Sequence, residues 1–171
     1  MNKIQALIAV VVLAAVALFA AILGGTSSAA SQKAPKGALV SLHRTALGKV
    51  LVDARGHTLY LFEKDKKGMS LCNGTCVAYW PPILSSAKPR AGVGVRASLL
   101  GRTRRADGRR QVTYAGHPLY TFVGDTKAGQ TTGEGLTDFG AAWDAIAPNG
   151  KSIEPNAPAT GRSGSGDGPG W

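Results

Sequence analysis

A ten-residue segment of this chain occurs twice, and this internal repeat constrains the fold more than any other feature. Residues 56–65 and residues 116–125 share the frame Gly-His-x-Leu-Tyr-x-Phe-x-x-Asp in the same register. Each copy is followed by a glycine and then by a tryptophan, Trp80 in the first copy and Trp143 in the second. Half-domains of about 50 to 60 residues bury too little surface to be more than marginally stable alone. We therefore expect the two copies to pack as a pseudo-twofold pair that buries their aromatic faces together.

Each copy lies at the end of a predicted β-hairpin. Residues 50–52 lead through a polar, Gly-containing turn into residues 58–62, and residues 111–114 lead through a second Gly-containing turn into residues 119–123. Runs of β-branched and aromatic residues separated by such turns are typical of hairpins. The 23 Gly and 9 Pro of the chain disfavour long helices. These patterns predict an all-β fold, mainly antiparallel hairpins, in which two fused half-repeats form one domain.

Alternation along the predicted strands separates aromatic from aliphatic side chains. Tyr60 and Phe62 fall on one face of their strand, whereas Leu59 and Leu61 fall on the other. We expect the aromatic side chains of both copies to form the core, although the same set could line a pocket for an aromatic or sugar-like ligand. The set comprises Tyr60, Phe62, Trp80, Tyr120, Phe122 and Trp143.

The first 30 residues have the pattern of a targeting segment. Lys3 is their only charged residue, residues 6–23 carry no polar side chain, and small residues follow. This pattern predicts a secretory signal peptide. As a helix the apolar run would span roughly 27 Å, which also fits an uncleaved membrane anchor. In either case we expect the rest of the chain to be extracytoplasmic, either secreted or held at the outer face of the cytoplasmic membrane. Because no cysteine follows the apolar run, we expect no lipoprotein anchor.

Composition divides the rest of the chain into a linker, a folded domain and a tail. The tail is rich in Gly, Ser and Pro, which disfavours a packed core. The predicted division is a linker at residues 31–38, a tandem-repeat domain at 39–150 and a disordered tail at 151–171. Within the domain we expect half-repeats at about 39–86 and 105–150, joined by a basic linker at 87–104.

The two cysteines of the chain are predicted to form a disulfide, because the domain faces an oxidising compartment. Cys72 and Cys76 enclose Asn73-Gly74-Thr75, in which Asn-Gly favours the necessary turn. So small a ring restricts the unfolded chain only modestly, by about 2 kcal/mol. We expect the bridge to hold a loop rather than the whole fold.

The repeated Tyr-x-Phe-x-x-Asp frame resembles the bacterial "secreted repeat of unknown function" family. The similarity extends over roughly residues 39–150. It includes Cys72 and Cys76 in a Cys-x-Gly-x-Cys arrangement, Trp80-Pro81-Pro82, Arg105-Ala106-Asp107-Gly108, Trp143 and Pro148-Asn149-Gly150. The resemblance implies an exported protein built from tandem repeats, and it implies no activity. The absence of a lipoprotein cysteine is a departure from the lipoprotein members of the family.

The motif aspartates permit two interpretations. Asp65 and Asp125 could act as paired carboxylates, either for acid–base chemistry or for binding a hard cation. Alternatively, each could close the turn that follows its strand. We favour the second interpretation because nearby lysines disfavour a cation.

A copper-binding or redox site is the alternative that the His, Met and Cys residues suggest. Its candidate ligands are His57, His117, Met69, Cys72 and Cys76, with His43 as a further histidine. Each motif histidine follows a glycine at a predicted turn, where an exposed side chain is expected. A bridged cysteine pair also offers no thiolate to a metal.

A basic stretch connects the two copies. Lys plus Arg number 20 against 10 Asp plus Glu, giving a net charge of +10. We expect the stretch to bind an anionic envelope component, such as a lipid headgroup or wall polymer, or to be a solvated linker. It contains no aromatic residues for base stacking, so no specific nucleic-acid partner is expected. The candidate anion-binding residues are Arg102, Arg104, Arg105, Arg109 and Arg110.

The chain lacks the local motifs of hydrolases, zinc proteases, phosphate-binding loops and haem attachment. With three histidines and no local nucleophile–base pattern, no catalytic residue or cofactor is assigned. The sequence predicts an exported cell-envelope protein with a non-enzymatic binding or structural role. A membrane contact through the N-terminal helix is expected only if that helix is not cleaved.

Overall fold

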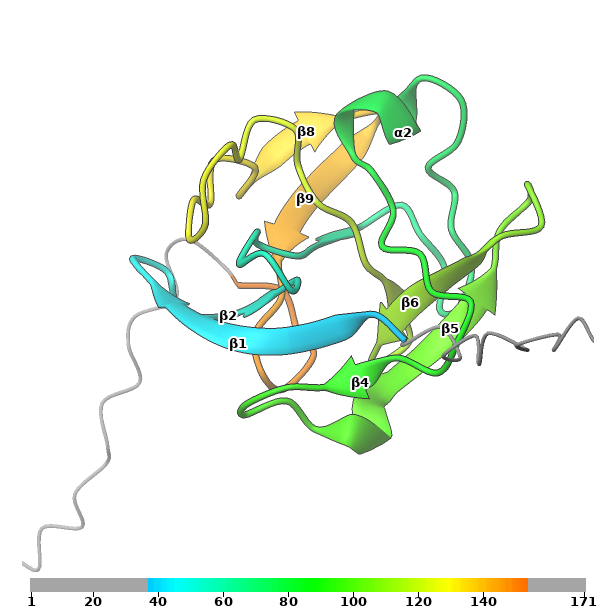
Figure 1. The fold of residues 1–171 in the computed structure, drawn as a ribbon. Coiled ribbons are helices and arrows are strands. Elements are labelled where there is room, and N and C mark those ends of the chain that lie inside the picture. The colour runs from blue at the N-terminus through cyan, green and yellow to red at the C-terminus, as the bar shows by residue number, and fades with distance from the viewer. Residues whose placement is uncertain (1–36, 154–171) are drawn as a thin grey trace, which may run out of the picture. The chain divides into compact units, whose positions relative to one another are not determined.

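The computed structural model describes residues 37–153, whose regular secondary structure is mostly strand with very little helix (Figure 1). The predictions for the N-terminal segment, most of the first linker and most of the tail lie outside these residues. No helix within residues 37–153 is long and apolar enough to cross a membrane. The elements are, in chain order, β1 (Leu39–Thr45), β2 (Gly48–Val52), β3 (Tyr60–Phe62), α2 (Cys76–Tyr79), β4 (Arg90–Ala91), the 3-10 helix η1 (Ala97–Leu99), β5 (Leu100–Arg104), β6 (Arg110–Tyr114), β7 (His117–Pro118), β8 (Leu136–Asp138) and β9 (Ala141–Ala145).

The strands form three small sheets, with the orders β2-β1-β4, β3-β9-β8 and β5-β6-β7. All strand pairs in these sheets are antiparallel except β1–β4, which is parallel. The predicted all-β fold of two half-repeats is therefore confirmed. Each half contains an antiparallel hairpin, β1–β2 in the first and β5–β6 in the second, followed by its copy of the motif.

The first motif strand pairs differently from the predicted hairpin. Val52 and Thr58 form only an isolated bridge, and the chain then leaves β2 so that β3 pairs with β9. Asp53 closes the tight turn between the two segments, because its side chain accepts hydrogen bonds from the backbone N–H groups of Arg55 and His57. The main partner of β2 is β1.

Residues 87–104, predicted to be a basic linker between the half-repeats, contain regular secondary structure. They contain β4, η1 and β5, and β5 is the counterpart of β1 in the second half. The second half therefore begins near residue 100 rather than near residue 105. The sequence of β5 shows no alternation of apolar and polar residues, because Arg102 and Arg104 occupy positions at which a strand usually has apolar residues.

The pseudo-twofold axis passes between Tyr60 and Tyr120. The backbone N–H of Tyr60 donates to the carbonyl of Tyr120 at 2.9 Å, and the N–H of Tyr120 donates to the carbonyl of Tyr60 at 3.0 Å. When a residue exchanges both backbone hydrogen bonds with the equivalent residue of the other repeat, a twofold axis lies between the two. The side chains follow the same symmetry, because the Tyr60 ring stands edge-on to Trp80 at 5.4 Å and the Tyr120 ring stands edge-on to Trp143 at 5.1 Å.

Four aromatic rings form a continuous stack across this axis. Trp80 and Trp143 stack on one another at 4.0 Å. Phe62 covers the other face of Trp143 at 4.1 Å, and Phe122 covers the other face of Trp80 at 4.4 Å. Each motif phenylalanine thus packs on the tryptophan of the opposite copy. The aromatic side chains form one core cluster, while the leucines on the opposite strand faces belong to a second, largely aliphatic cluster, as the alternation predicts.

The two halves also exchange their last extended segments. Ile83 of the first half hydrogen-bonds through its backbone to Val112 and to Leu119 of the second half. Ile146 of the second half bonds in the same way to Leu51 and Leu59 of the first. Each half therefore supplies backbone pairing that completes the other, and neither is a closed unit.

Candidate functional site

The motif tyrosines and aspartates form two crossed pairs. The Tyr60 hydroxyl donates to Asp125 Oδ2 at 2.6 Å, and the Tyr120 hydroxyl donates to Asp65 Oδ2 at 2.7 Å. Burial raises the pKa of both hydroxyls, and the facing carboxylates raise it further. The tyrosines therefore remain protonated donors at physiological pH.

The second oxygen of each aspartate closes its own loop. Asp65 Oδ1 accepts the backbone N–H of Leu71 at 2.7 Å, and Asp125 Oδ1 accepts the N–H and the hydroxyl of Thr132 at 2.8 and 2.7 Å. Burial raises the pKa of Asp65, against the opposing hydrogen bonds from Leu71 and Tyr120. All four carboxylate oxygens thus accept hydrogen bonds inside the protein, and the arrangement joins the two copies.

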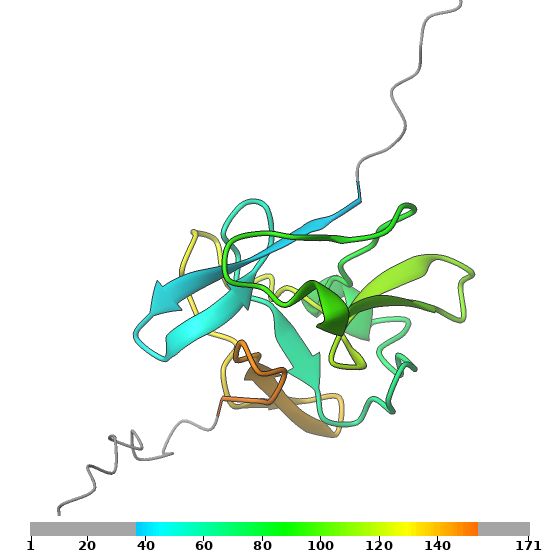
Figure 2. The ribbon, with the colours of Figure 1, turned by 90° about the horizontal axis from the view of Figure 1, so that it is seen from below.

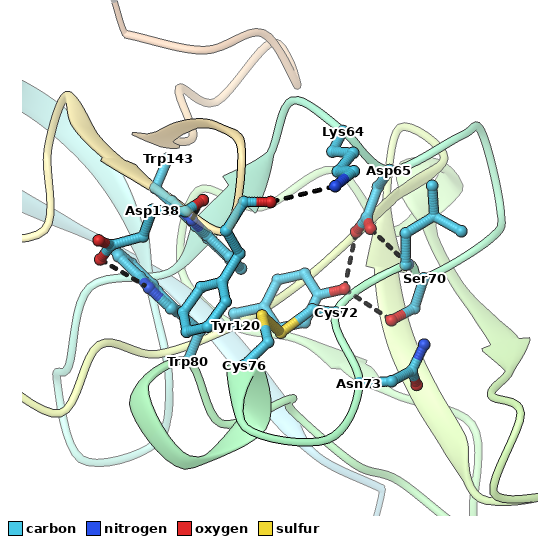
Figure 3. Close-up of a disulfide and its surroundings, with 12 residues drawn as sticks. Lys64, Asp65, Ser70, Cys72, Asn73, Cys76, Trp80, Tyr120, Asp138 and Trp143 are labelled. Carbon is cyan, nitrogen blue, oxygen red and sulfur yellow. Dashed lines mark hydrogen bonds between the residues drawn. A yellow bond between two sulfur atoms is a disulfide. The ribbon is translucent and has the colours of Figure 1, made fainter.

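The cysteines form the predicted disulfide, with their Cα atoms 5.3 Å apart. Figure 3 shows the bridge beside Tyr120, whose hydroxyl bonds to Asp65 and Ser70. Cys72 and Cys76 are both buried in the aromatic core cluster. Because Cys76 begins α2, the bridge ties the helix to that core.

Arg105, predicted to bind an external anion, is instead a buried structural residue with 3% of its surface exposed. Its Nη1 donates to Ser70 Oγ at 2.7 Å and to Gln111 Oε1 at 2.6 Å. Its Nη2 donates to the Cys72 carbonyl at 2.6 Å and to Asn73 Oδ1 at 3.2 Å. The guanidinium therefore supports the disulfide loop and is not available to a surface anion.

Two of the other predicted arginines also have partners within the protein. Arg102 Nη1 donates to the Ser86 carbonyl at 2.5 Å. Arg109 forms an ion pair with Asp107 at 2.7 Å, and its hydrogen bonds hold the pKa of that carboxyl at about 2. Arg104, Arg109 and Arg110 are all exposed, but among residues 37–153 only Arg109 of these three forms an ion pair.

Arg104 and Arg110 stand directly opposite one another at the end of the β5–β6 hairpin. Like charges opposite one another in a sheet are destabilising unless a counter-charge intervenes. A surface pocket of about 420 Å³ lies beside Arg110, lined by Leu84, Ser85, Ser86, Gly108, Arg109 and Arg110. The pocket offers cationic donors and small polar side chains, which suit an oxyanion.

The first half carries an equivalent arrangement. Arg44 and Lys49 stand directly opposite one another at the end of the β1–β2 hairpin, and both are exposed. Arg44 precedes Arg104 by the same 60 residues that separate the motif copies. A smaller pocket of about 170 Å³ lies here, lined by Leu42, His43, Arg44, Lys49, Val93 and Gly94. We call these two sites, Arg44 with Lys49 and Arg104 with Arg110, the basic hairpin tips.

The observations give no support to the copper alternative. Cys72 and Cys76 are oxidised, so they hold no thiolate for a metal. His57 Nδ1 lies 3.8 Å from Asp53 Oδ2, His117 begins β7, and the Met69 side chain is exposed. Within the described part of the chain, no group of three or more His, Cys, Asp or Glu residues is arranged to hold a metal ion.

Glu134 is a titratable group that the sequence analysis missed. Its Oε2 accepts the backbone N–H of Ala145 at 2.6 Å, while Oε1 is buried and accepts no hydrogen bond from residues 37–153. Burial raises the pKa of this carboxyl to about 7, helped by the charge of Asp144. No local sequence pattern distinguishes Glu134 from an exposed loop glutamate.

We expect Glu134→Gln to stabilise the protein above pH 7. The unfolded carboxyl loses its proton near pH 4.5 and the folded one near pH 7. The folded state therefore binds more protons between these values, and stability falls as the pH rises through this window. After a discount for partial exposure, the loss is on the order of 1–2 kcal/mol. Thermal unfolding at pH 4 and pH 8 measures it, with the exposed Glu63→Gln as control. Equal pH dependence in wild type and Glu134→Gln would contradict the assignment.

Two segments of the chain, residues 41–83 and 101–147, match the family model described as "Secreted repeat of unknown function". Together they cover more than half of the chain. The chain belongs to this family. No curated protein and no solved structure matches it. The matched segments correspond to the two halves of the secreted-repeat fold, from β1 to Ile83 and from β5 to the residue after Ile146. The family description supports an extracytoplasmic location.

Proposed function

We propose that this secreted-repeat protein is a non-enzymatic module that binds phosphate-bearing components of the cell envelope. The observation that carries the proposal is the pair of basic hairpin tips, Arg44 with Lys49 and Arg104 with Arg110. Each tip places two cations directly opposite one another, at a cost that a bound anion would remove. The net charge of +10 would draw the protein toward an anionic surface.

The buried polar groups support a binding role rather than catalysis. Both motif carboxylates and the Arg105 guanidinium make their hydrogen bonds inside the protein. A general acid or base must reach the substrate proton. The exposed chemistry of the basic hairpin tips is that of cations, which pair with phosphate oxygens.

The positions of the basic hairpin tips favour attachment at two places. In Figure 1 the β1–β2 hairpin and the β5–β6 hairpin lie at opposite sides of the domain, and the turned view in Figure 2 agrees. A module of this shape could contact two phosphate groups on separate stretches of an envelope polymer, or two headgroup surfaces. Two linked contacts give a higher overall affinity than either one.

Binding to phosphatidylglycerol vesicles at low ionic strength tests the proposal. Arg104→Ala/Arg110→Ala should weaken binding about thirty-fold, since each basic residue near an anionic surface contributes about 1 kcal/mol. Lys66→Ala/Lys127→Ala removes the same charge from exposed positions outside the tips and should have a smaller effect. Wild-type binding should also collapse between low and high salt, because exposed charges are screened.

A second arm of this experiment separates the two sources of phosphate. A soluble poly(glycerol phosphate) should compete with the vesicles if a wall polymer is the ligand, and should compete poorly if the ligand is a headgroup array. Binding that is indifferent to salt, or equal losses in the tip and control variants, would overturn the proposal.

A further inference from the structure

The turn between β8 and β9 contains a bulky residue in a backbone conformation that disfavours it. Phe139 and Gly140 are the two residues between these strands, with φ angles of 56° and 88°. Two-residue hairpin turns with positive φ at both positions strongly prefer Asn-Gly. Positive φ is unusual for a large side chain and carries strain. The local backbone therefore gives no reason for phenylalanine at residue 139.

The Phe139 ring does not compensate by entering the core. It is 40% exposed, and its centroid lies 6.0 Å from that of Tyr79, which is 51% exposed. The half-buried Phe122 has one face on Trp80. A pocket of about 420 Å³ lies among these rings, lined by Thr75, Tyr79, Phe122, Asp138 and Phe139. Three aromatic side chains from three separate segments thus meet at one surface hollow.

The same pocket contains polar groups that have no hydrogen-bond partner among the described residues. Across residues 37–153, no hydrogen bond involves the hydroxyls of Thr75 and Tyr79 or the Oδ1 atom of Asp138. Asp138 Oδ2 accepts a hydrogen bond from Trp80 Nε1 at 3.4 Å, which Figure 3 shows and which orients the carboxylate. The carboxylate is thus held by the core tryptophan while its second oxygen stays available.

We propose that this pocket binds a pyranose ring of a neutral glycan. A sugar ring presents C–H groups on its faces, which pack on aromatic rings, and hydroxyls at its edge, which pair with a carboxylate and with protein hydroxyls. A cationic ligand is disfavoured because Lys64 Nζ donates to the Phe139 carbonyl at 3.1 Å and brings a positive charge to the site. An acyl chain would leave the polar groups of the pocket unpaired.

The pocket is held in place before any ligand binds. Thr75 and Tyr79 are four residues apart at α2, so they lie on the same side of this short helix. The Cys72–Cys76 bridge ties the start of α2 to the aromatic core. A preformed site loses less conformational entropy on binding. This inference is independent of the basic hairpin tips, which lie on other elements.

Isothermal titration with N,N′,N″-triacetylchitotriose and with maltotriose tests the inference. Wild-type protein should bind at least one of these neutral probes, with an affinity unchanged between low and high salt. Phe139→Asn should weaken binding at least ten-fold and leave the melting temperature unchanged or higher, since asparagine suits the turn. Asp138→Asn should also weaken binding, whereas Val93→Asn, an exposed apolar residue elsewhere, should not.

The outcomes distinguish a ligand-binding role for Phe139 from a role in shielding the core. Equal affinities in wild type and Phe139→Asn, or no binding of either probe, would overturn the inference. A lower melting temperature for Phe139→Asn with no glycan binding by the wild type would mean that the ring only shields the core. Loss of vesicle binding in the tip variants with retained glycan binding would show that the two sites are separate.

Discussion

Arg105→Ala is expected to lower the free energy of unfolding by about 3–5 kcal/mol, which is a large part of the stability of a domain of this size. The substitution removes a buried guanidinium that donates to Ser70, Gln111, Asn73 and the Cys72 carbonyl. Ser70, Gln111 and the Cys72 carbonyl would then lose their donor in a buried region, each at a cost of about 1–3 kcal/mol if it stays unpaired, whereas the exposed Asn73 can turn to water.

Lysine should not rescue this site. Arg105→Lys keeps the charge, but an ammonium group cannot reproduce the planar fork that serves two acceptors from each terminal nitrogen. We expect it to recover less than half of the loss. Urea unfolding of the disulfide-intact protein measures the effect, with the exposed neighbour Arg104→Ala as the matched control. A loss below about 1 kcal/mol for Arg105→Ala would show that water replaces the guanidinium at little cost.

The repeat was the part of the fold that the sequence could predict. Identical residues at a fixed spacing implied two copies, and alternation placed Tyr60 and Phe62 on the face that is buried between them. Both signals are local, since they depend on residues within one strand or on simple comparison of the chain with itself. The pairing of Tyr60 with Tyr120 follows from them once the copies are related by a twofold.

The parts that could not be predicted depend on contacts distant in sequence. Ile83 and Ile146 carry no signal that they pair with the opposite half. Arg105 resembles its exposed neighbours in type and spacing, and only its acceptors, up to 35 residues away, distinguish it. In the sequence, only the family resemblance of Arg105-Ala106-Asp107-Gly108 distinguishes Arg105 from the other arginines.

The candidate sites show the same limit. The net charge and the arginine-rich stretch indicated an anion-binding surface, yet only the β5–β6 register shows that Arg104 and Arg110 stand opposite one another. The equivalent pair, Arg44 and Lys49, was missed because its two residues do not form a basic run. Charge composition predicts that a basic surface exists, and strand register decides where it lies.

Separation of the two halves should abolish folding. A fragment of residues 37–95 loses Ile146, which pairs with Leu51 and Leu59, and a fragment of residues 96–153 loses Ile83. Each fragment also keeps one tryptophan of the Trp80–Trp143 stack and exposes a face that the other covered. Chains of this length with an open aromatic face bury too little surface to offset their conformational entropy.

An equimolar mixture of the two fragments should recover the native fold, because the same backbone pairs and ring contacts can form between chains. Near-ultraviolet circular dichroism reports the tryptophan stack, and thermal unfolding reports cooperativity. We expect neither signal from either fragment alone and both from the mixture, with a transition temperature that rises with protein concentration. The intact chain under the same conditions is the control. A sharp thermal transition from residues 37–95 alone would show that the first half is an independent domain, and the exchange of Ile83 and Ile146 would then be a contact between finished folds rather than the step that completes them.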